Sequence, residues 1–68
     1  MSAAQLEVLG RELARKYGVE LQDVRFSQDE DVVRFTISGR PYMIPLGPAE
    51  TVRQELAAAL ENDGLRPK

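Results

Sequence analysis

The sequence contains neither cysteine nor histidine among its 68 residues. Without cysteine the chain can form no disulfide and has no thiolate, which is compatible with a reducing compartment. Without histidine it lacks the commonest general base and any imidazole ligand for a metal ion. We therefore expect neither a metal site nor a cofactor.

Long apolar runs are also missing. No segment approaches the roughly 20 consecutive apolar residues that span a membrane. Residues 1–7 lack the charged leader and apolar block of a secretory signal. We therefore expect a cytoplasmic protein.

Neither sign of charge dominates the composition. The chain carries 9 basic and 11 acidic residues, for a net charge of −2. A sequence-independent nucleic-acid binder would normally be basic, so nucleic acid is not the partner that this balance favours. The length predicts a single domain over residues 1–68 with one modest core.

The stretch Asp31–Leu46 contains two runs in which apolar residues alternate with other residues. This period of two predicts strands at about 32–38 and 42–46, each with one buried face. The expected buried residues are Val33, Phe35, Ile37, Tyr42, Ile44 and Leu46. A four-residue loop, Ser38–Pro41, is expected to join them, because a shorter loop at Gly39–Arg40 would need the N–H that Pro41 lacks. Ile37 then faces Tyr42, and Pro45 lies at an outer edge.

A third strand is predicted at about residues 21–27, where Val24 and Phe26 alternate with polar neighbours. Pairing Phe26 with Val33 would match apolar residues and place Arg25 directly opposite Arg34. Leu21 has the wrong parity for the buried face, so we expect a bend near residues 22–23.

Helices are predicted at about residues 3–17 and 48–63. Ser2 and Gln5 have the spacing of a capping box, and Gly18 is suited to end the first helix. Gly10 lies beside the apolar stripe, where we expect close packing. Pro48 suits the start of the second helix, and Gly64 suits its end. Residues 65–68 are expected to form a tail that is frayed over its last three residues.

Both helices carry one apolar stripe that must be buried. The economical arrangement is a two-layer α+β fold of order α-β-β-β-α. In it, a three-stranded antiparallel meander carries both helices on one face.

This element order resembles the double-stranded-RNA-binding domain over nearly the whole chain. That family contacts RNA through its first helix, its first hairpin loop and a lysine-rich start to its second helix. Here the corresponding loop, Gln28–Asp31, is acidic, and the second helix begins Gly47–Glu50 without lysine. The resemblance therefore implies the fold, and it transfers no RNA-binding residues.

The sheet face away from the helices is the candidate binding surface. The predicted pairing assigns it the charge anchors Arg25 and Arg34, with Arg40 at the turn, and the uncharged residues Thr36, Val32 and Met43. Like charges opposite one another on a sheet are unfavourable, so a carboxylate partner is expected to compensate. Arginine and methionine together also fit a protein interface. The alternative is an ordinary solvated sheet face.

Other surfaces have simpler interpretations. The strand at 21–27 is a sheet edge without proline. Two interpretations stand equally: the edge pairs into a homodimer with a six-stranded sheet, or the bend near residues 22–23 protects it. Asp29–Asp31 lacks the ligand spacing and glycine of a calcium loop and is expected to be a solvated turn. Tyr17 and Tyr42 are expected to pack their rings in the core and to keep their hydroxyl groups in contact with water.

No residues in the sequence form a recognisable catalytic arrangement, and the glycines do not form a phosphate loop. We therefore expect a non-catalytic regulatory module, not an enzyme, that binds a protein partner through the open face of the sheet. One alternative is a nucleic-acid-binding domain that uses the sheet arginines. Another is a small inhibitor, of the kind carried by phages and mobile elements, that acts on host nucleic-acid machinery.

Overall fold

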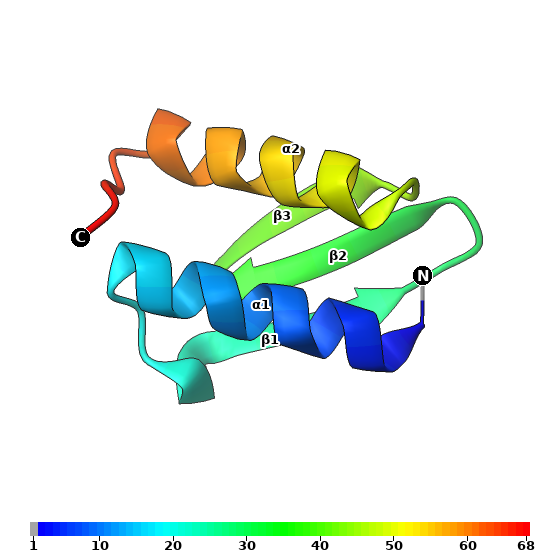
Figure 1. The fold of residues 1–68 in the computed structure, drawn as a ribbon, viewed down its shortest axis with the longest axis horizontal. Helices are drawn as coiled ribbons and strands as arrows, with labels where there is room; N and C mark the ends of the chain where they lie inside the picture. Colours follow the sequence, from blue (N-terminus) through cyan, green and yellow to red (C-terminus); the bar gives the residue numbers. More distant parts are fainter. Residues whose placement is uncertain (1) are drawn as a thin grey trace.

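The computed structural model describes residues 2–68 and has the predicted order α-β-β-β-α. Its elements are α1 (Ala3–Tyr17), the short 3-10 helix η1 (Leu21–Asp23), β1 (Val24–Gln28), β2 (Val32–Ile37), β3 (Arg40–Pro45) and α2 (Ala49–Asn62). The strands form one antiparallel sheet in the order β1-β2-β3. Both helices lie on the same face of this sheet, as predicted (Figure 1). Within residues 2–68, no helix is long and apolar enough to cross a membrane.

Helix α1 covers the residues that the sequence pattern predicted. The hydroxyl of Ser2 accepts a hydrogen bond from the Gln5 N–H at 3.2 Å, and the Ser2 N–H donates to Gln5 Oε1 at 2.9 Å. This is the expected capping box. At the other end, Gly18 has a φ of 70°, and the Val19 N–H donates to the carbonyl of Ala14 at 2.8 Å. The left-handed glycine turns the chain away from the helix axis.

Helix α2 ends with the same motif, but the chain after it is not frayed. Gly64 has a φ of 96°, and the Leu65 N–H donates to the carbonyl of Leu60 at 3.1 Å. The Lys68 N–H then donates to the Lys16 carbonyl at 2.7 Å. The predicted fraying is therefore wrong, because the last residue caps a carbonyl that would otherwise lack a partner at the end of α1.

The β2–β3 turn has two residues, Ser38 and Gly39, instead of the predicted four. Their φ angles of 52° and 81° are those of a type I′ turn, whose twist matches that of the flanking strands. Ile37 pairs with Arg40, and the predicted pair of Ile37 with Tyr42 is wrong. Pro41 lies opposite Thr36, one step from the closing pair. That step is a non-hydrogen-bonded position, so the missing N–H of Pro41 costs no hydrogen bond to β2.

The register of β1 on β2 is also shifted by two residues from the prediction. Phe26 pairs with Phe35, with ring centroids 6.3 Å apart, and does not pair with Val33. Arg25 consequently lies opposite Thr36, not opposite Arg34. The predicted bend is present as η1, so the strand begins at Val24 and not at residue 21.

The core lies between the sheet and the helices. Its buried apolar side chains include Leu6, Leu9, Leu13, Tyr17, Val33, Phe35, Ile37, Tyr42, Ile44, Val52, Leu56 and Leu60. Gly10 is buried against the sheet, where a Cβ atom would lie 3.3 Å from Val24 Cγ1. The predicted close packing at this glycine is confirmed.

Candidate functional site: the open sheet face

The helices leave the other face of the sheet uncovered, and we call this surface the open sheet face. Alternation along the three strands and their pairing assign side chains to it. They are Arg25, Ser27, Val32, Arg34, Thr36, Pro41, Met43 and Pro45. Five of the six residues predicted for this surface, all except Arg40, therefore lie on it.

The pairing arranges these side chains in rows that cross the sheet. One row runs from Ser27 through Arg34 to Met43, and the next runs from Arg25 through Thr36 to Pro41. Together they surround a shallow depression of about 420 Å³. Arg25 on the edge strand β1 and Arg34 on the central strand β2 provide charged contacts, and Met43 on β3 provides an apolar one.

The two arginines of this surface differ in their partners. Arg34 Nε lies 3.5 Å from Asp29 Oδ2, and both side chains are 57% exposed. An ion pair this exposed contributes little to stability. Arg25 forms no ion pair with any of residues 2–68. Its guanidinium is therefore available to a carboxylate from another molecule.

Met43 is the most exposed large apolar side chain that the structure describes, at 62%. It lies on β3 opposite Arg34. The unbranched thioether adapts its shape to different partners, which makes methionine common at binding surfaces.

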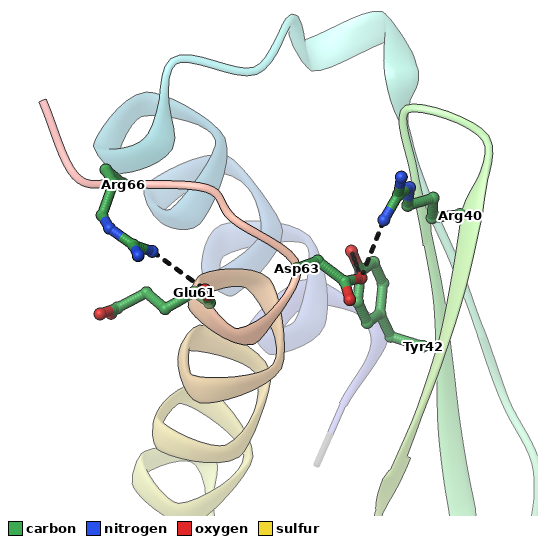
Figure 2. A network of polar contacts seen from close by, with 5 residues as sticks. All are labelled: Arg40, Tyr42, Glu61, Asp63 and Arg66. Atoms are coloured by element: carbon green, nitrogen blue, oxygen red, sulfur yellow. Dashed lines mark hydrogen bonds and ion pairs between the residues drawn. The ribbon is translucent and has the colours of Figure 1, made fainter.

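Arg40 does not belong to the open sheet face. The two-residue turn pairs it with Ile37, whose side chain is buried toward the helices. Arg40 Nη1 instead lies 3.6 Å from Asp63 Oδ2, at the end of α2 (Figure 2). The sequence prediction that grouped Arg40 with the other arginines is therefore wrong in geometry. Recognising the Ser38–Gly39 turn would have put Arg40 on the helix side, since it then has the parity of Tyr42.

Hydrogen bonds from two tyrosines connect the end of α2 to α1 and to β3. Tyr17 of α1 donates a hydrogen bond to Glu61 Oε2, and Tyr42 of β3 donates one to Asp63 Oδ2, both at 2.6 Å. Arg66 Nη1 also donates to the Glu61 carbonyl at 3.0 Å (Figure 2). The predicted core packing of both tyrosines is confirmed, but no sequence pattern indicated their carboxylate partners.

These contacts make both tyrosines harder to ionise. The hydrogen bond to Glu61, with smaller effects of burial and of the carboxylate charge, raises the pKa of Tyr17 to about 12. Burial, followed by the hydrogen bond to Asp63, raises the pKa of Tyr42 to about 12. Protonated tyrosines that donate to carboxylates fit a structural role better than a role in proton transfer.

No group of acidic side chains among residues 2–68 is arranged to hold a metal ion. The acidic turn between β1 and β2 is exposed throughout, and Asp29 is engaged with Arg34.

Comparison of the chain with protein-family models, with curated proteins and with solved structures gives no match. The resemblance to the double-stranded-RNA-binding domain consequently rests on element order alone. Two of the three places where that family contacts RNA carry acidic residues here, namely Asp29–Asp31 and Glu50 at the start of α2.

Proposed function

We propose that this chain is a small non-catalytic regulatory module that binds a protein partner through the open sheet face. The observation that carries the proposal is the position of Met43. Its side chain is 62% exposed, and it lies opposite Arg34 and between the two prolines of β3, on a sheet face that neither α1 nor α2 covers. A methionine and arginines within one surface are the composition that distinguishes protein interfaces from the rest of a protein's surface.

The same surface defines the chemistry of the partner. Arg25 has no carboxylate partner within residues 2–68, and the pair between Arg34 and Asp29 is exposed enough to be exchanged. A partner surface with one or two carboxylates around an apolar residue would pair with the arginines and cover Met43. We place this interaction in the cytoplasm, since a cysteine-free chain suits a reducing compartment.

The test is affinity capture from a lysate of the source organism with three versions of the chain. The first is the wild type, and the second is Arg25→Glu/Arg34→Glu. The third is a matched control, Arg11→Glu/Arg15→Glu, which makes the same charge change on the exposed surface of α1. Each capture is repeated after nuclease treatment and at high salt.

The proposal predicts a protein that survives nuclease, binds the wild type and the α1 control, and is lost with the sheet variant. Equal binding to all three versions would overturn the proposed surface. Recovery of nucleic acid that salt removes would instead support the nucleic-acid alternative, because phosphate contacts weaken steeply with ionic strength.

A further inference from the structure

The outer edge of β1 presents backbone groups that have no partner among residues 2–68. The Ser38 N–H donates to the Asp23 carbonyl, and the Asp29 N–H donates to the Val32 carbonyl, so odd-numbered residues of this segment bond toward β2. In an antiparallel pair the backbone groups of the alternate residues point away. The outward residues are therefore Val24, Phe26 and Gln28.

One of the outward-pointing backbone groups already has a hydrogen-bond partner within the chain. The Val24 N–H donates to the Leu21 carbonyl, so η1 closes one end of the edge. The Val24 carbonyl and both backbone groups of Phe26 and Gln28 have no backbone partner within residues 2–68. The predicted protection of this edge by a bend thus applies only to its beginning.

The opposite edge of the sheet is blocked. The two prolines of β3 both stand at positions where an N–H would point outward, because they lie opposite Thr36 and Val32 at non-hydrogen-bonded pairs. The sheet therefore has one edge that can accept another strand, and that edge is β1.

We propose that β1 pairs antiparallel with β1 of a second copy of this chain, so that the two sheets join into one of six strands. The pairing is centred on Phe26, which is the midpoint of the strand Val24–Gln28. In this register Phe26 exchanges two hydrogen bonds with the partner's Phe26, and each Gln28 N–H donates to the Val24 carbonyl across the interface. The free groups of Phe26, the Val24 carbonyl and the Gln28 N–H then have partners. The Gln28 carbonyl gains none, because the Val24 N–H opposite it already donates to Leu21.

The side chains favour this register over its neighbours. Phe26 is only partly buried beside the fully buried Phe35, and it gains an aromatic neighbour across the two-fold axis. Arg25 faces a serine of the second copy. Centring the pair on Arg25 would oppose two arginines, which is unfavourable. Centring it on Ser27 would pair residues 24 and 25 with residues beyond the end of the strand.

The two-fold axis is perpendicular to the sheet, so both helix layers fall on one side of the joined sheet and both open sheet faces on the other. The dimer does not depend on the proposed function, since it uses the edge of the sheet and not its face.

The first test measures the mass of the protein by analytical ultracentrifugation at concentrations up to about 1 mM, a range that detects weak association. Gln28→Pro removes an N–H that points away from β2, and it should raise the dissociation constant of the dimer roughly thirtyfold by deleting two hydrogen bonds. Gln28→Ala keeps the N–H and is the control. Circular dichroism checks that each variant is folded.

The second test reads the register directly and does not depend on the proline variant. Because the chain has no cysteine, Arg25→Cys and Ser27→Cys each introduce a single thiol. When the two variants are mixed and oxidised, the proposed register brings residue 25 opposite residue 27 of the second copy, within reach of a disulfide. Two copies of residue 25 would be about 7–8 Å apart on the diagonal. We expect the mixed disulfide and little of either symmetric one.

A wild-type chain that stays monomeric throughout the concentration range would overturn the proposal. So would a dimer that Gln28→Pro leaves unchanged while the variant is folded. Symmetric disulfides that form as readily as the mixed one would overturn the register.

Discussion

At the scale of single residues, the absence of a side chain at position 10 determines how closely α1 approaches the sheet. A Cβ atom there would lie 3.3 Å from Val24 Cγ1 and 3.9 Å from Phe35 Cε1. Glycine lowers helix propensity by about 1 kcal/mol relative to alanine, so this position accepts a local cost. The compensation is the contact of the α1 backbone with the first two strands.

We therefore expect Gly10→Leu to lower the free energy of unfolding by about 1–3 kcal/mol, the usual cost of overpacking a core. Urea denaturation should show a lower midpoint with an unchanged slope. The control is Val8→Leu on the exposed side of α1, which should shift stability by less than about 0.5 kcal/mol. Equal stability of the Gly10→Leu protein and the wild type would contradict the close packing at this site.

The tyrosine–carboxylate contacts predict a loss of stability at alkaline pH. Both tyrosines have folded-state pKa values near 12, whereas an unfolded tyrosine ionises near pH 10. A raised folded pKa contributes stability that is complete below pH 10 and is lost as the pH rises toward 12. Thermal unfolding measured from pH 8 to about pH 11.5 should show this decline.

The double variant Tyr17→Phe/Tyr42→Phe isolates the tyrosine contribution to this decline. It should be less stable than the wild type at neutral pH, by about 1 kcal/mol for each lost hydrogen bond, with a flatter alkaline decline. A decline as steep as that of the wild type would assign it to other groups.

At the scale of elements, the alternation of apolar residues predicts faces better than it predicts register. Val33, Phe35 and Ile37 are all buried, as expected from their spacing. Both strand pairs were nevertheless predicted with a shift of two residues. Such a shift leaves every side chain on its own face, so hydrophobic pattern alone cannot exclude it.

Turn chemistry supplies the missing information about register. Ser38 has a φ of 52°, which is uncommon for a residue with a side chain, and Gly39 has a φ of 81°. Serine is a weak signal at this position of a type I′ turn, where asparagine is preferred. The short turn was therefore missed, and with it the place of Arg40 beside Asp63.

Ser38→Asn should stabilise the fold, because it gives the turn its preferred Asn-Gly pair. We expect a gain of about 0.5 kcal/mol, typical of relieving backbone strain at one position. Ser27→Asn is the control, since Ser27 lies within a strand and should gain nothing. A loss of stability in the Ser38→Asn protein would argue against the two-residue turn.

At the scale of the whole molecule, one face of the sheet is buried under two helices and the other is exposed (Figure 1). The sequence predicted this two-layer arrangement for two reasons. Both helices have a single apolar stripe, and apolar residues alternate with other residues along each strand, which gives the sheet one buried face. It also predicted five of the residues on the exposed face. The sixth, Arg40, depended on the turn and was misplaced.

The exposed face and the free edge of β1 are separate features of this arrangement. The face presents Met43 with two arginines, and the edge presents backbone groups at alternate residues. The open sheet face suits a partner that presents carboxylates around an apolar residue. The edge of β1 suits the same strand of another copy of this chain. A dimer would present two open sheet faces side by side, so bivalent partners would bind more tightly than monovalent ones.

The most direct test of the binding surface places a photoreactive benzoylphenylalanine at Met43 and, in a separate chain, at Val8. Both side chains are apolar and exposed, at 62% and 55%, but they lie on opposite layers of the fold. After irradiation in cells of the source organism, the account predicts a protein adduct from position 43 and none from position 8. Adducts from position 8 alone, or an adduct of position 43 with nucleic acid in place of protein, would contradict it.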